Sequence, residues 1–363
     1  MRFSLKKTFA FITRYQRILS TVSTVVGFVM HVVIINAIDL ALTEFILAGH
    51  LLIVSGATLI GALPSAGERA NSFFARARSL MPLIYQYSTG ALLSSFLILY
   101  AASGSLTASL PFLVLLAVAA IGNEALRLER GLLPFQTTLL ALNGLLYAAL
   151  IIPILLHEIS IQAFLTAVTL TAMLFALFVA VLWFLARRSV GASLSRVVTS
   201  AVSTFGLVMI LYFGNVMPPI PLAVKDDGFY HEVAKVGNQY RVLDEPGSAS
   251  FFDLGGRVLY LGLGERAYFY SAIFAPATLG TDIVHRWQHY DPTGKTWSTV
   301  EVVTFPITGG RDAGYRGYSF INTPEPGQYR VSVETAQGQI LGHYPLTIVR
   351  TPATVTTEVR MLK

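Results

Sequence analysis

Seven long apolar runs dominate the first 220 residues or so of this chain, and they restrict its fold more than any other feature. A helix needs roughly 20 consecutive apolar residues to cross about 30 Å of hydrocarbon. The runs are Ile18–Ile38, Ala41–Leu63, Leu80–Ser103, Leu106–Gly122, Leu132–Leu156, Ile161–Ala186 and Val197–Val216. This pattern predicts an all-α membrane bundle of about seven transmembrane helices.

Charge is scarce and unevenly divided. Only 13% of the residues are charged, whereas a soluble domain usually has about 25%. Residues 1–224 hold 13 Lys/Arg and 6 Asp/Glu, and residues 225–363 hold 13 and 14, so the net charge of +6 comes from the apolar part. A basic chain can indicate nucleic-acid binding. Here the positive charge lies in short loops between apolar runs, which indicates membrane topology and no nucleic-acid partner.

The basic loops alternate with loops that have no Lys or Arg. The basic residues of this part are Arg2, Lys6, Lys7, Arg14, Arg17, Arg69, Arg76, Arg78, Arg127, Arg130, Arg187, Arg188 and Arg196. The alternate loops lie near Asp39, Gly104 and His157–Glu158. Because Lys and Arg are retained on the cytoplasmic side, the pattern predicts a multi-pass protein of the bacterial inner membrane. Its N-terminus is expected in the cytoplasm and its C-terminal domain in the periplasm.

The N-terminal segment, residues 1–17, is basic and amphipathic. The first apolar run follows it as in a secretory signal, but the run lacks a small-residue cleavage pattern and is expected to remain as a signal anchor. Residues 1–17 and Glu68–Ser79 are either surface helices on anionic lipid or ordinary positive-inside flanks. The second interpretation is favoured.

A few polar side chains interrupt the apolar runs. The main candidates for intramembrane chemistry are His31, Asn36, Glu44 and His50, and Gln86 and Asn143 are further examples. His31 and His50 are expected at similar depths, so a bis-histidine haem or a proton relay is conceivable. Hydrogen bonds between packed helices are the favoured interpretation, and no cofactor is predicted.

After residue 222 the pattern changes to short alternating segments separated by turn residues. The expected strands are Tyr230–Val236, Gln239–Leu243, Tyr268–Phe274, Ile283–Tyr290, Thr296–Phe305, Tyr315–Asn322, Gln328–Glu334 and Ile340–Val349. Eight such strands predict an all-β, immunoglobulin-like sandwich. The predicted domains are therefore the segment 1–17, a bundle over 18–222 and a β domain over 223–363.

The C-terminal region offers little catalytic chemistry. The chain has no cysteine, which excludes disulfides, thiolate metal sites and Cys nucleophiles. His285 and His289 fall on one strand face, but strand positions four apart are about 13 Å distant, so no metal site is predicted. Gly262–Ala267 resembles a dinucleotide fingerprint but lacks the following helix. No Ser/His/Asp arrangement stands out by spacing, and a non-enzymatic protein is expected.

Aromatic and basic residues of the β domain instead suggest a binding surface. The candidates for contact with a partner are His285, Arg286, Trp287, Trp297, Tyr315, Arg316, Tyr318 and Arg330. Such residues are enriched where proteins bind other proteins, and aromatic rings also stack on sugars and lipid headgroups. The alternative is that most of these aromatic residues belong to the core.

Four short motifs in this region resemble the bacterial domain-of-unknown-function 2914 family. They are His285-Arg286-Trp287, Tyr315-Arg316-Gly317-Tyr318-Ser319, Gly327-Gln328-Tyr329-Arg330-Val331 and Gly338-Gln339-Ile340-Leu341-Gly342. The resemblance covers about residues 280–350, and the family pattern commonly has Trp where this chain has Tyr315 and Tyr329. It implies an envelope location and a β-sandwich after a multi-span membrane region. It implies no substrate.

Three functions fit these features. The leading hypothesis is a non-enzymatic membrane protein that displays its β domain to a protein or glycan partner, as an accessory subunit of an envelope complex. The alternative is a transporter or lipid-handling protein with His31, Glu44 and His50 around a polar site in the bundle. A membrane sensor is the third, and it would need a separate protein for its output.

Overall fold

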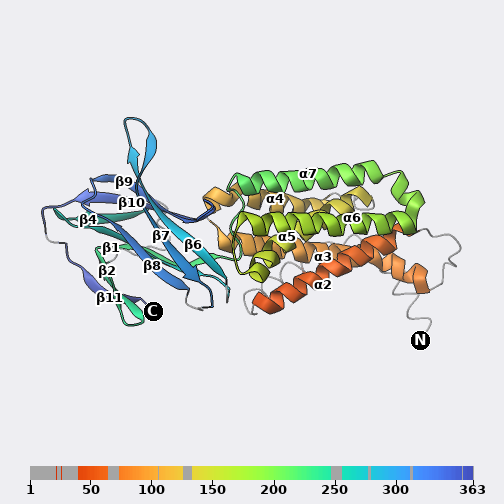
Figure 1. Cartoon of the computed structure of the whole chain (residues 1–363), viewed down its shortest axis with the longest axis horizontal. Coiled ribbons are helices and arrows are strands. Elements are labelled where there is room, and N and C mark those ends of the chain that lie inside the picture. The colour runs from red at the N-terminus through yellow and green to blue at the C-terminus, as the bar shows by residue number, and fades with distance from the viewer. Residues whose placement is uncertain are drawn as a thin grey trace. The chain divides into compact units, whose positions relative to one another are not determined.

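The structure is a computed structural model, and it describes residues 22, 26, 40–63, 73–104, 106–125, 133–246, 256–276, 279–310, 314–353 and 355–362. This chain forms two compact units, one mainly helical and one built of strands (Figure 1). The residues Ala101–Ser109 and Leu156–Ile161, at the ends of helices, belong to the β unit. The segment 1–17, His31, Asn36 and most of the first apolar run lie outside the described residues.

Six helices make up the described part of the bundle. They are α2 (Leu40–Ala62), α3 (Phe73–Ser103), α4 (Leu106–Ala125), α5 (Leu133–Leu156), α6 (Ile161–Gly191) and α7 (Leu194–Phe213). Five of them, all except α4, are long and apolar enough to cross a membrane, and α4 contains a shorter apolar stretch over Ala108–Asn123. These helices match the second to seventh predicted runs.

Three of these apolar helices are mostly exposed, whereas a soluble bundle buries its most apolar helices. In α3 and α5, 67% of the most apolar window is buried, whereas the windows of α2, α6 and α7 are 22%, 11% and 17% buried. The outer helices expose large apolar side chains, such as Phe45, Phe184 and Ile210. Water would penalise such a surface and hydrocarbon would not, so the described helices suit a lipid environment.

The apolar part of α6 ends at a kink. Ala186 has non-helical backbone angles (φ −132°, ψ 38°), and a short continuation to Gly191 follows. Arg187 is in this continuation, with its guanidinium carbon 5.5 Å from the ring centre of Trp183. A Trp beside an Arg is typical of the membrane interface.

The β unit contains eleven strands among the described residues. They are β1 (Ala223–Tyr230), β2 (Glu232–Val236), β3 (Gln239–Asp244), β4 (Arg257–Leu261), β5 (Ala267–Phe274), β6 (Gly280–Asp291), β7 (Thr296–Thr308), β8 (Tyr315–Ile321), β9 (Gly327–Thr335), β10 (Ile340–Arg350) and β11 (Glu358–Leu362). They form a five-stranded sheet of order β4-β10-β9-β6-β7 and two three-stranded sheets of orders β1-β5-β8 and β11-β3-β2.

The β1-β5-β8 sheet lies between two apolar cores. Phe229 and Phe269 pack into the larger core with Trp287 of the five-stranded sheet. Their chain neighbours Tyr230 and Tyr270 point the opposite way, into a smaller core with residues of the β11-β3-β2 sheet. The sequence of β5, AYFYSAIF, has almost no polar alternation because both of its faces are covered.

All eight predicted strands are present within a few residues, although Tyr230 ends β1 instead of starting β2. Strands β1, β4 and β11 were not predicted. Strand β11 joins β3 in the third sheet, β1 pairs with β5, and β4 pairs parallel to β10. The β-rich character of the region is therefore confirmed, with a more complex arrangement than a two-sheet antiparallel sandwich.

Candidate functional site

The structure separates the eight predicted partner-binding residues into three places. His285 and Trp287 lie in the larger core. Arg286, Trp297 and Arg330 lie on the outer face of the five-stranded sheet, away from that core. Strand β8, in the β1-β5-β8 sheet between the two cores, carries Tyr315, Arg316 and Tyr318. The eight residues therefore do not form one patch. Arg286, Trp297 and Arg330 combine aromatic and charged side chains on the outer face of the five-stranded sheet.

His285 and Trp287 are both 0% exposed, so neither presents a surface to a partner. The Nε2 of His285 lies 2.8 Å from the Oγ of Ser271, and its Nδ1 lies 3.0 Å from the Oγ of Ser319. The indole N–H of Trp287 donates to the same Ser319 oxygen at 2.9 Å. The polar contacts of His285 are therefore structural contacts within the core.

The His285 cluster superficially resembles a nucleophile with its base, but it is closed to substrate. Ser271 and Ser319 are 0% and 2% exposed. The rings of Phe269 and Phe305 stand edge-on to the imidazole, with centres 5.0 and 4.9 Å away. Burial lowers the pKa of His285 to about 3. The imidazole is therefore a neutral core group at physiological pH.

The outer face of the five-stranded sheet carries a ladder of polar cross-strand pairs. Arg286 on β6 donates from Nε to both carboxylate oxygens of Glu334 on β9, at 3.2 and 3.1 Å. Burial raises the pKa of Glu334, and the charge of Arg286 opposes that shift. Between β9 and β10, the Nδ1 of His343 lies 2.8 Å from the Oγ of Ser332. Burial, together with the charge of Arg330, lowers the pKa of His343.

Next to this ladder, Arg330 contacts the β6–β7 hairpin. Its Nε donates to the Oε1 of Gln288 at 2.7 Å, and its guanidinium carbon lies 4.4 Å from the ring centre of Trp297. Tyr290, which pairs with Trp297 across the hairpin, has its ring centre 5.2 Å from that of Trp297. We call Arg330, Gln288, Trp297 and Tyr290 the hairpin cluster.

The hairpin extends beyond its neighbouring strand. Pairing of β6 with β9 ends at His289, whereas pairing of β6 with β7 continues to Asp291 and Thr296 (light blue in Figure 1). The side chains of Tyr290 and Trp297 are therefore only partly covered. Two further apolar residues of β7, Val300 and Val302, are 47% and 44% exposed.

The β8 group is mostly engaged within the domain. Tyr315 packs against the larger core. Arg316 donates from Nη1 to the carbonyl of Asn238 at 3.0 Å, and its own carbonyl accepts a hydrogen bond from the Tyr240 hydroxyl at 3.1 Å. Tyr318 is 37% exposed, with its ring centre 6.2 Å from that of Tyr240. Arg316 and Tyr318 therefore join the β1-β5-β8 sheet to the β11-β3-β2 sheet.

The intramembrane candidates do not form one site among the described residues. Glu44 interacts electrostatically with Tyr147 of α5, whereas the ring of His50 lies edge-on to Tyr87 of α3, with centres 5.7 Å apart. Six residues along a helix correspond to roughly 120° of net rotation, so these two side chains point to different helices. His31 and Asn36 lie outside the described residues.

Of the other two polar residues of the runs, Gln86 bonds to another helix, as the favoured interpretation expects, whereas Asn143 bonds to its own helix. Gln86 of α3 donates to the carbonyl of Asn123 on α4 at 3.4 Å. Asn143 donates to the carbonyl of Leu139, one turn earlier on its own helix, at 2.7 Å. Both side chains therefore serve packing or local helix structure.

Several residues of the site were not predicted. No sequence motif marks Gln288 or Glu334 as functional. Their contacts with Arg330 and Arg286 can be inferred only when the strand order β9-β6-β7 is known. A polar groove of about 420 Å³, lined in part by His231, Glu265 and Arg266, was also missed. Within the described part of the chain, no group of three or more His, Cys, Asp or Glu residues could hold a metal ion.

Comparison with known proteins identifies one family. Residues 280–348 match the model of a family described as "Protein of unknown function (DUF2914)", which confirms the resemblance expected from the motifs. The match covers β6 to most of β10 and therefore includes the hairpin cluster. No curated protein matches the chain.

The similar solved structures have little overall likeness. A crystal structure of β-glucosidase from Listeria innocua is 12% identical with a TM-score of 0.20, and the match covers 38% of this chain and 18% of that one. The same enzyme in complex with gluconolactone has a TM-score of 0.19, over 34% and 16%. The chain thus spans under a fifth of that enzyme. The Pseudomonas fluorescens alkylpurine DNA glycosylase AlkC, bound to DNA with an abasic site analogue, is 12% identical with a TM-score of 0.20, over 86% and 100%.

Proposed function

We propose that this chain is an integral membrane protein that displays its β unit to an envelope protein, which binds at the hairpin cluster. The contact of the Arg330 guanidinium with the half-covered ring of Trp297 is the observation that most favours this function. Trp, Tyr and Arg dominate the binding energy of protein interfaces. The hairpin cluster contains one of each beside the exposed apolar side chains of β7.

Packing already orients this cluster before any partner binds. Gln288 fixes the guanidinium of Arg330, and the paired strands hold Trp297 against Tyr290. A preformed aromatic and basic surface loses little conformational entropy on binding. The neighbouring pair of Arg286 and Glu334 supplies polar groups of both signs, as is common around an apolar contact.

The proposed location is the bacterial inner membrane, with the N-terminus in the cytoplasm and the β unit in the periplasm. The apolar outward faces of α2, α6 and α7 support membrane insertion. The restriction of all 13 basic residues of the first 224 to alternate loops supports the orientation. An accessory role in an envelope complex would follow from these two features and the hairpin cluster together.

Site-specific photocrosslinking of the full-length protein in its native membranes tests the partner site. A photoreactive amino acid replaces Thr299, on the same outer face as Trp297, and the control position is Val236, which is 52% exposed on a different sheet. One defined adduct from position 299, absent from position 236, is expected. Truncation of a central interface residue costs about 2 kcal/mol or more, so Trp297→Ala or Arg330→Ala should weaken binding about thirtyfold.

Two results would change or contradict this proposal. A position-299 adduct that glycan-degrading enzymes remove would identify a glycan partner instead of a protein. Equal crosslinking from positions 299 and 236, unaffected by Trp297→Ala, would exclude the hairpin cluster as the contact site.

A further inference from the structure

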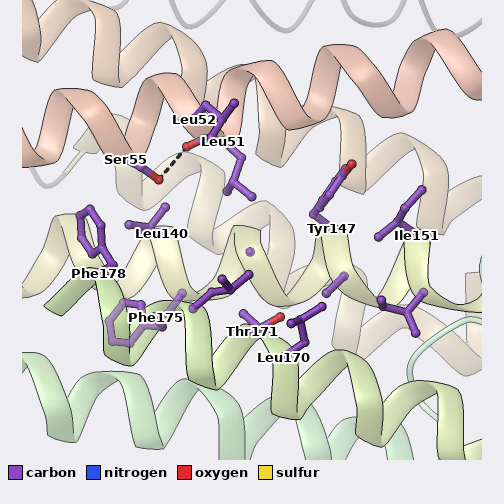
Figure 2. A pocket seen from close by; sticks show the side chains of 15 residues that line it. Leu51, Leu52, Ser55, Leu140, Tyr147, Ile151, Leu170, Thr171, Phe175 and Phe178 are labelled. Carbon is purple, nitrogen blue, oxygen red and sulfur yellow. Dashed lines mark hydrogen bonds between the residues drawn. The ribbon is translucent and has the colours of Figure 1, made fainter. Parts of the chain in front are cut away.

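We propose that a pocket between α2, α5 and α6 binds one hydrocarbon chain of a membrane lipid. The pocket has a volume of about 340 Å³, within the range of roughly 300–1,000 Å³ that is usual for small-molecule sites. Figure 2 shows side chains of all three helices converging on it. It is separate from the hairpin cluster. It rests on the membrane insertion proposed above, but not on the proposed partner site.

The chemistry of the lining excludes a polar ligand. None of the lining residues is charged. The hydroxyl of Ser55 donates to the Leu51 carbonyl at 2.9 Å (dashed in Figure 2), and that of Thr171 donates to the Ala167 carbonyl at 2.8 Å. These two hydroxyls are therefore satisfied by their own helices, and the Tyr147 hydroxyl is the third in the lining. A strongly polar ligand would lose most of its hydrogen bonds to water without replacement, whereas an alkyl chain would lose none.

The pocket is elongated along the helices. Its lining runs from Leu140 to Ile152 on α5, which corresponds to roughly 18 Å at 1.5 Å per residue. Small residues of α5, such as Gly144, lie along this path. A Cβ at Gly144 would come only to 3.4 Å from the Thr171 methyl. A long space beside small residues suits an extended chain better than a compact ring system.

The two ends of the pocket differ in polarity. Phe175 and Phe178 lie beside Leu140 at one end, and Tyr147 lies toward the other (Figure 2). The Tyr147 hydroxyl is the polar group of that end. A lipid chain in the pocket would thus have its methyl end among the phenylalanines and its headgroup on the side of Tyr147.

The surroundings identify the source of such a chain. Leu52 and Leu174, which line the pocket, are 74% and 58% exposed, so the pocket opens on the apolar outer surface of the bundle. In a bilayer that surface contacts lipid tails. A tail that enters the pocket replaces contacts with mobile neighbouring tails by van der Waals contacts with side chains of three helices. These contacts favour an occupied pocket.

The test uses full-length protein reconstituted in phospholipid vesicles with a trace of phospholipid whose acyl chain carries a terminal diazirine. After photolysis, mass spectrometry should locate adducts on the pocket-lining parts of α5 and α6. Leu174→Trp, which fills the pocket, should lower this labelling severalfold, because the indole ring takes the place of the acyl chain beside α5 and α6. Leu177→Trp is the matched control, because Leu177 is 61% exposed on the same helix and does not line the pocket.

The result can contradict the proposal in two ways. Labelling spread evenly over the outer faces of α2 and α6, with Leu174→Trp and Leu177→Trp equally affected, would mean ordinary lipid contact only. A pocket that stays unlabelled while those faces react would mean that another group fills it. If Leu174→Trp lowers the yield of folded protein, Gly144→Leu blocks the pocket from α5 and should give the same loss of labelling.

Discussion

The Nδ1 of His285 lies 3.0 Å from the hydroxyl oxygen of Ser319, in the core between the five-stranded sheet and the β1-β5-β8 sheet. Ser319 also accepts the indole N–H of Trp287, so its own hydroxyl hydrogen remains available to His285. Ser271 can then accept from the opposite ring nitrogen. One arrangement of hydrogens thus satisfies both ring nitrogens of His285 and the indole N–H of Trp287, and it requires a neutral imidazole.

We expect this neutral imidazole to make the β unit sensitive to acid. The folded pKa of His285 is about 3, below its ordinary value of 6.5. Between these two pH values the unfolded chain binds a proton that the folded chain does not, so stability falls as pH falls. The loss from this one group is about 1.4 kcal/mol per pH unit below pH 6.

Fluorescence of Trp287 measures this effect in the full-length protein. Trp183→Phe and Trp297→Phe remove the other two tryptophans. Denaturant midpoints at pH 7 and pH 5 are compared with and without His285→Gln. The difference between the two pH values should shrink in His285→Gln, and an unchanged difference would show that other groups cause the acid sensitivity.

Ser319→Ala should destabilise the β unit by about 2–4 kcal/mol. It leaves the Trp287 indole N–H and one His285 nitrogen without their partner in a core that water does not reach, and each unsatisfied buried group costs about 1–3 kcal/mol. The same Trp287 fluorescence reports the shift in midpoint. Ser298→Ala is the control, because Ser298 is exposed and bonds only weakly to the His289 carbonyl at 3.3 Å; a similar loss in both variants would contradict the prediction.

Gly309→Ala should be strongly destabilising for a backbone reason. A Cβ at Gly309 would overlap the carbonyl oxygen of Pro276, and backbone atoms cannot move away as a flexible side chain can. We expect a loss of about 2–4 kcal/mol. Gly280→Ala is the comparison, since a Cβ there meets only the His157 carbonyl at an ordinary 3.9 Å, and it should stay within about 1 kcal/mol of the parent protein.

The sequence was sufficient for the parts of the fold that depend on local pattern. Hydrophobic run length identified α2 to α7, and alternation identified eight of the strands within a few residues. Strands β4 and β11 have only five residues each, and their partners are distant in the chain. Long-range pairing of this kind leaves no local signature, so these two strands were not predicted.

The binding candidates show a similar division. Alternation along β6 places His285 and Trp287 on one face and Arg286 on the other, so the grouping of all three in one patch could have been avoided from the sequence. The contact of Arg330 with Trp297 could not have been predicted, because it requires β9, β6 and β7 to be neighbours in that order.

The proposed orientation predicts opposite labelling of two introduced cysteines. The chain has no cysteine, so each substitution creates a single reactive thiol. Glu158 lies in the loop between α5 and α6, which has no Lys or Arg, and Ala192 lies in the loop between α6 and α7, beside the basic residues Arg187 and Arg196. Because positive charge is retained in the cytoplasm, a membrane-impermeant maleimide applied from the periplasmic side should label Glu158→Cys. It should label Ala192→Cys only after the membrane is opened. Labelling of Ala192→Cys in sealed cells would reverse the orientation and place the hairpin cluster in the cytoplasm.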